Sequence, residues 1–224
     1  MNFELGTWNF ELYDMLFLKQ LLLIIKFKAQ SSKLKVQSSK LKVQSSKFKV
    51  QSKMISVLSV VHDTMVDGPG FRTSIYCAGC PNHCPECHNP QSWDINHGTM
   101  TSTEELMKEI MDDPFANVTF SGGDPMFQAE GFAELARAIR QQSDKTIWCF
   151  TGFLFENLVK NPAQLELLKL IDVLVDGPYQ KDKRDTDLFF RGSSNQRIIN
   201  VKKSLQEGKV VEIHLTKENP NPVL

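Results

Sequence analysis

Four of the five cysteines in this chain fall between Cys77 and Cys87, and this crowding constrains its fold and function most. A disulfide framework would spread its cysteines to close long loops and would need an even number of them. Thiols gathered in one short segment instead favour a metal site in a reducing compartment. Cys80, Cys84 and Cys87 have the spacing C-x-x-x-C-x-x-C directly after a predicted strand. This spacing lets three thiolates converge on one iron–sulfur cube.

Three thiolates hold three irons of such a cube and leave the fourth iron open, because an ordinary electron-carrying cluster takes four cysteines. An open coordination position is where a substrate binds, as at catalytic zinc sites. Cys77 is the rival fourth ligand. Side chains alternate along a strand, so residues three apart tend to face opposite sides. We therefore expect Cys77, and Cys149 in the hydrophobic segment WCF, to be buried structural thiols.

A structural zinc site is the alternative, with residues 77 and 80 as one C-x-x-C pair and residues 84 and 87 as the other. Zinc ribbons separate such pairs by roughly 15–20 residues, whereas three residues lie between Cys80 and Cys84. A thioredoxin-like redox pair fits less well, because four cysteines crowd the loop. Zinc stays open as a competing interpretation.

The segment beyond Met54 alternates between strand and helix patterns. Helices are predicted at 101–113, where Thr101 and Glu104 have capping-box spacing, and at 129–143 and 161–170. Strands are predicted at 54–61, 71–77, 117–121, 145–150, 171–177, 197–205 and 209–215. This alternation indicates βαβ units and a parallel sheet. A complete eightfold barrel needs about 250 residues, so an α/β fold with a partial, open parallel barrel is expected, with its site at the carboxyl ends of the strands.

Residues 1–53 differ from the rest of the chain. The unit QSSKLKV begins at Gln30 and again at Gln37, and QSSKFKV begins at Gln44. These units carry too few apolar positions for a coiled-coil seam, and near-identical units resemble translated repetitive DNA. We expect a basic N-terminal extension that is disordered or a mis-assigned start, followed by one enzyme domain at 54–224. A basic anchor for membrane or nucleic acid is the alternative.

The charge distribution argues against a nucleic-acid partner. Residues 1–53 hold ten Lys and three acidic residues, so the remaining residues balance at −7 although the whole chain is neutral. A mildly acidic body does not suit broad binding to a phosphate backbone. The longest uninterrupted apolar run near the N-terminus, Leu21–Ile25, is far shorter than the roughly 20 residues that span a bilayer. We expect a cytoplasmic protein with no membrane partner.

Several ordered motifs add a family resemblance. The cysteine triad after a first strand resembles the radical S-adenosylmethionine superfamily. DGPGFR at 67–72 and HN at 88–89 look like the glycyl-radical-enzyme activases within it. A narrower group, the activating proteins of anaerobic ribonucleoside-triphosphate reductase, is similar in the segments SGGDP, WCFTGF, VLVDGPY and RGSSNQ, which begin at residues 121, 148, 173 and 191. The resemblance covers most of the body beyond Met54.

This resemblance implies the site residues. Cys80, Cys84 and Cys87 would hold a [4Fe–4S] cluster whose open iron is chelated by the amino and carboxylate groups of S-adenosylmethionine. The further cofactor-binding residues that it implies are Glu86, Cys87, His88, Gly122, Gly123 and Asp124. Many superfamily members have an aromatic residue where Glu86 stands, so adenine recognition departs from the pattern. Candidate substrate or cofactor contacts are Arg72, Asn89, Thr151, Arg191 and Asn195; RGSSNQ suits a carboxylate or ribose.

The implied reaction is the one-electron cleavage of S-adenosylmethionine to methionine and a 5′-deoxyadenosyl radical, which takes a hydrogen atom from one glycine of the reductase. The expected partners are the catalytic subunit of that reductase and an electron donor such as reduced flavodoxin. The cofactor carries the chemistry, so no catalytic side chain beyond the cluster ligands is expected. The alternatives are an activase of another glycyl-radical enzyme, such as pyruvate formate-lyase, and a small radical enzyme acting on a free metabolite.

Overall fold

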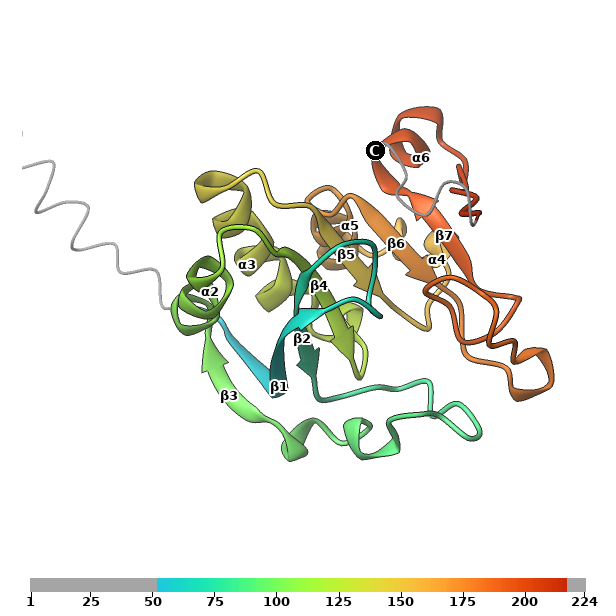
Figure 1. Cartoon of the computed structure of the whole chain (residues 1–224), viewed down its shortest axis with the longest axis horizontal. Helices are drawn as coiled ribbons and strands as arrows, with labels where there is room; N and C mark the ends of the chain where they lie inside the picture. The colour runs from blue at the N-terminus through green and yellow to red at the C-terminus, as the bar shows by residue number, and fades with distance from the viewer. Residues whose placement is uncertain (1–51, 217–224) are drawn as a thin grey trace, which may run out of the picture. The chain divides into compact units, whose positions relative to one another are not determined.

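The computed structural model describes residues 52–216, and its centre is a seven-stranded sheet in the order β3-β1-β2-β4-β5-β6-β7 (Figure 1). Four neighbouring strands run parallel. They are β2 (Arg72–Cys77), β4 (Asn117–Gly122), β5 (Ile147–Phe150) and β6 (Val173–Asp176). The antiparallel strands are β1 (Met54–Thr64), β3 (Thr99–Ser102) and β7 (Arg197–Asn200). The expected α/β fold with an open parallel barrel is confirmed. Apart from Ser52 and Lys53, the predicted N-terminal extension lies outside the described residues.

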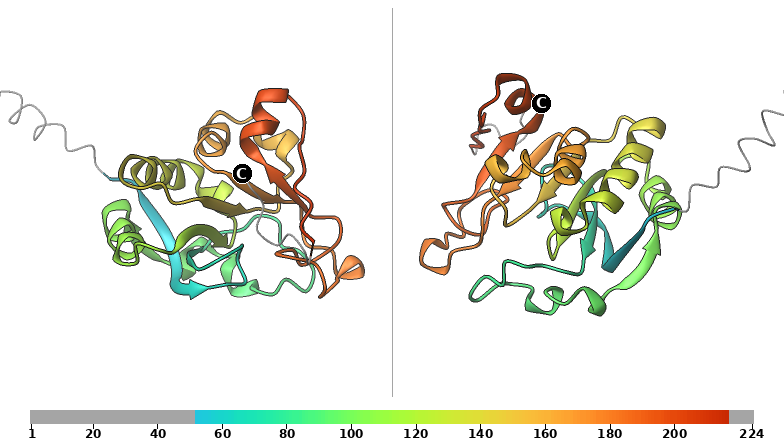
Figure 2. Two further views of the ribbon diagram at one scale, coloured as in Figure 1. Left: turned by 45° about the horizontal axis from the view of Figure 1, so that its top comes forward. Right: turned by 180° about the vertical axis from the view of Figure 1, so that it is seen from behind.

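The helices gather on one face of this sheet, as the view from behind in Figure 2 shows for α3 and α5. The helices are α2 (Thr103–Asp112), α3 (Ala129–Gln142), α4 (Phe155–Leu158), α5 (Pro162–Leu168) and α6 (Val201–Glu207). Short 3₁₀ turns occur at Pro90–Ser92, Ile95–His97, Pro125–Gln128 and Lys181–Lys183. None of the helices in the described part has the length and apolar character that a bilayer crossing requires.

The parallel strands divide the interior because successive side chains point to opposite faces. Toward the helices they bury the main hydrophobic core, to which β2 contributes Ile75 and Cys77, and β4 contributes Phe120. The opposite face has a smaller apolar cluster of Trp148, Val173, Val175 and Ile198. Tyr76 and Ser121 alternate with core residues and therefore belong to this second face. The candidate site lies on the same face, at the ends of the parallel strands.

Three of the predicted segments differ in the structure. The predicted helix at 101–113 begins at Thr103, with Ser102 rather than Thr101 as its N-cap and Glu105 completing the capping box. Thr101 instead pairs with Ile55 in β3, a strand that the sequence analysis did not predict. The segment 197–205, predicted as one strand, is β7 followed by α6, and the segment 209–215 forms only an isolated bridge between Ile199 and Glu212.

Arg72, a candidate substrate or cofactor contact, lies at the amino end of β2 and is only 1% exposed. Its guanidinium donates to Thr119 Oγ1 at 2.6 Å, to the Val118 carbonyl at 2.6 Å and to the Pro69 carbonyl at 3.2 Å. It also lies 5.5 Å from the Trp148 ring centroid. Burial lowers the pKa of Arg72 to about 10. The side chain therefore fastens the DGPG turn to the sheet, and the structure does not bring it to the cysteine loop.

Candidate cluster and cofactor site

The cysteine loop begins at the carboxyl end of β2 and is held by backbone hydrogen bonds from its first residues. The Gly79 amide donates to the Ser92 carbonyl at 2.7 Å, and the Cys80 amide donates to the Trp93 carbonyl at 3.0 Å. Farther along the loop, the Cys87 amide donates to the Cys84 carbonyl at 3.1 Å in a tight turn. The sequence placed this loop correctly, because a strand that ends in Cys77 feeds it directly.

The three predicted cluster ligands, Cys80, Cys84 and Cys87, are free and half-buried. Two of the sulfurs lie within hydrogen-bonding distance of N–H groups, as thiolate ligands of iron–sulfur clusters commonly do. The Asn82 side-chain amide lies 3.7 Å from Cys80 Sγ, and the Asn89 backbone amide donates to Cys87 Sγ at 3.4 Å. Burial raises the pKa of the Cys80 and Cys84 thiols, and nearby N–H groups oppose this rise.

Cys77 lies apart from these three thiols. It is fully buried in β2 among the hydrophobic core residues, and burial strongly raises the pKa of its thiol. Its position argues against the first C-x-x-C pair of the zinc alternative and against a fourth cluster ligand. Cys149 is likewise fully buried in the core.

The donor set fits a [4Fe–4S] cluster better than a single ion. Within residues 52–216, no group of three or more His, Cys, Asp and Glu side chains lies close enough together to hold one metal ion. A cube places each thiolate on a different iron, so its sulfurs stand farther apart than those around one zinc. Three free, half-buried thiols on one loop suit the three cluster ligands that the spacing predicts.

The two glycines at the end of β4 are needed for close backbone packing, whether or not a cofactor binds beside them. Gly122 has φ +101°, and a Cβ there would lie 2.4 Å from the Cys77 amide nitrogen. A Cβ on Gly123 would lie 2.5 Å from the Gly79 carbonyl oxygen. The Gly123 amide donates to the Cys77 carbonyl at 2.6 Å, and the Asp124 amide donates to the Gly79 carbonyl at 2.9 Å. The glycines thus let the end of β4 and the start of the cysteine loop lie against each other.

Asp124, predicted to contact the cofactor, is completely buried beneath the loop. Its carboxylate accepts hydrogen bonds from the Thr151 hydroxyl at 2.8 Å, the Gly152 amide at 3.0 Å, the Met126 amide at 3.0 Å and the Asn82 side chain at 2.9 Å. Burial raises the pKa of Asp124 to about 6 despite these donors. Thr151, a candidate substrate contact, is also buried and is engaged by this carboxylate. Both residues support the loop from below.

A pocket of about 620 Å³ lies against the third cysteine. It brings together five of the predicted residues, which are Cys87, His88, Asn89, Gly122 and Arg191. Gly123, Asp124 and Thr151 are not among its lining residues. The pocket therefore joins the cysteine loop, the end of β4 and the RGSSNQ segment, which lie far apart in the sequence.

The RGSSNQ segment presents unsatisfied polar atoms. Arg191 donates through one terminal nitrogen to the Gln196 carbonyl at 3.1 Å, while its buried Nε has no hydrogen-bond partner. Asn195 donates to the Pro178 carbonyl at 2.8 Å, and its buried Oδ1 also lacks a partner. A buried donor without a partner is costly, so Arg191 beside the pocket suits an anionic ligand group.

Sequence reasoning missed the pair of Asp67 and Tyr76 in the same pocket. The Tyr76 hydroxyl donates to Asp67 Oδ2 at 2.6 Å, and the Thr64 hydroxyl donates to the same oxygen at 3.1 Å. Burial and the Asp67 carboxylate raise the pKa of Tyr76. Strand alternation carried the signal for this pair, because Tyr76 must face away from the core side occupied by Cys77.

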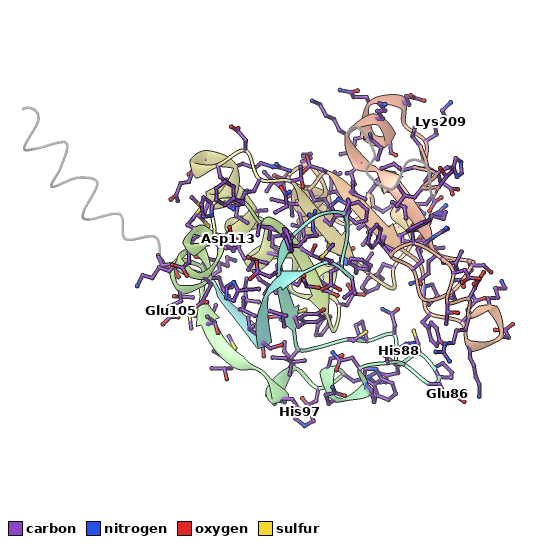
Figure 3. All side chains as sticks on the ribbon, viewed as in Figure 1. Glu86, His88, His97, Glu105, Asp113 and Lys209 are labelled. Carbon is purple, nitrogen blue, oxygen red and sulfur yellow. The ribbon has the colours of Figure 1, made fainter. Side chains whose placement is uncertain are left out.

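Glu86 and His88 connect the cysteine loop to the loop that follows β6, and Figure 3 labels both side chains. Glu86 forms an ion pair with Lys181, and both side chains are exposed. The His88 ring lies edge-on to Tyr179 with a centroid distance of 5.5 Å. Glu86 has φ 55°, an uncommon conformation for a residue other than glycine. Glu86 thus has a loop-to-loop contact of its own at the position where an adenine contact was expected.

A three-cysteine loop at the end of the first parallel strand of an open barrel, with a pocket against its third cysteine, defines a radical S-adenosylmethionine protein. The family model described as "4Fe-4S single cluster domain" matches residues 66–199. The chain belongs to this family, together with the anaerobic ribonucleoside-triphosphate reductase-activating proteins that it resembles over most of their length.

Three such relatives illustrate the similarity. The activating protein of Escherichia coli (strain K12) is 35% identical over 140 residues, which are 59% of this chain and 90% of that protein. The protein of Enterobacteria phage T4 is 34% identical over 139 residues, covering 59% and 86%. The protein of Vibrio cholerae is 34% identical over 142 residues, covering 60% and 90%. All three carry the name anaerobic ribonucleoside-triphosphate reductase-activating protein.

Proposed function

We propose that this protein activates anaerobic ribonucleoside-triphosphate reductase by generating its glycyl radical, through reductive cleavage of S-adenosylmethionine at a [4Fe–4S] cluster. The observation that carries the proposal is the pocket that joins Cys87 to the RGSSNQ segment. The names of the relatives supply the target, since they are activating proteins of that reductase. When bound, the cluster and S-adenosylmethionine supply the electron transfer and the radical chemistry.

The residues of this chain bind and orient those groups. Cys80, Cys84 and Cys87 are the proposed cluster ligands. Gly122 and Arg191 line the pocket beside Cys87, which suits them to the methionine end of the cofactor, where Arg191 can pair with the carboxylate. His88 and Asn89 are the proposed neighbours of the adenosyl end. Aromatic rings of Phe150, Tyr179 and Phe190 also line the pocket and limit the access of water.

An external one-electron donor completes the proposal, and a reduced flavodoxin is the donor that we propose. A reducing, cytoplasmic location is proposed with it. The support is that all five cysteines of the chain lie in the described part and are free, as expected where thiols are kept reduced.

S-adenosylmethionine cleavage under anaerobic conditions tests this function. The reconstituted protein, chemically reduced, is mixed with the cofactor and with increasing amounts of reductase catalytic subunit. We expect 5′-deoxyadenosine to form in amounts that follow the added subunit, because the radical is consumed at one glycine of that partner. Pyruvate formate-lyase serves as the control partner. Turnover on a free metabolite, with no response to the reductase, would contradict the proposal.

A further inference from the structure

Asn82 lies between the first two proposed cluster ligands in the sequence, and its side-chain amide contacts both Cys80 and Asp124. Its Nδ2 atom lies 2.9 Å from Asp124 Oδ2 and 3.7 Å from Cys80 Sγ. An amide nitrogen carries two hydrogens, so one N–H can bond to the carboxylate while the other bonds to the sulfur. The side chain is half-buried, which strengthens both interactions relative to water.

Asp124 fixes the orientation of this amide. Asp124 is completely buried, and its carboxylate oxygens act as acceptors in each of its side-chain hydrogen bonds. An ionised carboxylate has no hydrogen to donate, so it must face the NH₂ end of Asn82 and not the carbonyl end. The remaining N–H is thereby directed at Cys80 Sγ. Asp124 thus orients the contact between Asn82 and Cys80 without contacting a proposed cluster ligand itself.

The absence of a side chain at Gly152 leaves room for the Asn82 amide. A Cβ on Gly152 would lie 2.4 Å from Asn82 Nδ2 and 2.7 Å from Asn82 Cγ. The Gly152 amide also donates to the same Asp124 oxygen that accepts from Asn82. The end of β5 therefore leaves a space of side-chain size for Asn82, and the carboxylate anchors both residues.

We infer that Asn82 is a positioning residue which Asp124 orients against Cys80, and that its N–H···S bond raises the reduction potential of the cluster. The inference rests on the proposed function, because it requires a cluster on Cys80. Reduction adds negative charge that spreads onto the thiolate sulfurs. A donor aimed at one of them stabilises the reduced form, and hydrogen bonds to the sulfurs are among the factors that set such potentials. The effect would ease electron entry before cofactor cleavage.

Replacing Asn82 with leucine removes both N–H groups while keeping the side-chain size. Redox titration of the reconstituted cluster, followed by the paramagnetic signal of its reduced form, should show a lower potential in Asn82→Leu. We expect the ratio of reduced to oxidised cluster at a given potential to fall about tenfold, which is 59 mV for a one-electron couple. The matched control is Asn96→Leu, because Asn96 is exposed and bonds to Asp94 outside the loop. Its potential should equal that of the unmodified protein.

Gly152→Ala provides a second variant in which the sequence of the cysteine loop is unchanged. It should displace the Asn82 amide and lower the potential in the same direction. Loss of iron from Asn82→Leu, in a protein that still melts cooperatively without cluster, would support the positioning role. Unchanged potential and iron content in both variants would overturn the inference. An unmodified protein that binds no iron–sulfur cluster would overturn the proposed function instead, so the two failures are distinguishable.

Discussion

Replacing Cys84 with alanine is expected to abolish both the iron–sulfur cluster and reductase activation, whereas Cys77→Ala should retain most of each. Cys84 is half-buried on the cysteine loop, and its thiol is free. Cys77 is fully buried in the core of the helix-covered face. Removing its sulfur leaves a small cavity, with an expected loss of about 1 kcal/mol in the free energy of unfolding. Iron and acid-labile sulfide in the anaerobically purified variants measure the difference.

The same analysis discriminates the competing interpretations of the loop. Equal loss of iron from a folded Cys77→Ala variant would make Cys77 a ligand and would contradict the three-cysteine account. Stoichiometric zinc without iron in the unmodified protein would favour a structural zinc module.

Gly122→Ala is expected to lower the free energy of unfolding by about 3 kcal/mol, because it combines strain with a steric clash. The residue has φ +101°, and the added Cβ would lie 2.4 Å from the nitrogen and 2.6 Å from the oxygen of Cys77. Real Cβ atoms do not approach backbone so closely, so β2 and β4 must separate where the cysteine loop begins. Denaturant unfolding of the cluster-free protein measures the loss, and iron content after reconstitution should fall with it.

Gly208→Ala is the matched control for this substitution. Gly208 also has a positive φ, +67°, but nothing lies within 4 Å of a Cβ built there. It should cost only the backbone strain, about 1 kcal/mol, and should leave the cluster unaffected. Equal losses of unfolding free energy in the two variants would show that a side chain at Gly122 does not clash with the Cys77 backbone.

The parallel centre of the sheet and the cysteine loop could be predicted because their signals are local. Short segments rich in β-branched and aromatic residues marked β2, β4, β5 and β6, and the cysteine spacing marked the loop. The start of α2 could not be fixed, because the sequence TSTEE contains two overlapping capping boxes. Pairing of Thr101 with Ile55 places Thr101 in β3 and leaves Ser102 as the cap. Only the tertiary structure decides between the two registers.

The support beneath the site could not be predicted for the same reason. Arg72, Asp124 and Thr151 are polar residues next to motifs, which suggested ligand contacts. The structure uses them to hold elements together, since their partners come from distant segments such as Thr119 and Asn82. Conversely, Tyr76 lines the pocket; strand alternation predicts which face it lies on, but not that a pocket forms there. Residue types in the sequence therefore indicate which chemistry is available, but long-range packing determines which polar residues line the pocket and which hold the structure together.

Electron paramagnetic resonance of activated reductase tests the central claim most directly. The reduced protein is mixed anaerobically with S-adenosylmethionine and the catalytic subunit of anaerobic ribonucleoside-triphosphate reductase, and in parallel with pyruvate formate-lyase. The account predicts a glycyl radical signal with the reductase, little with the lyase, and none when Cys84→Ala replaces the unmodified protein. A signal with the lyase alone, or no glycyl signal from a protein that carries the cluster and cleaves the cofactor, would contradict it.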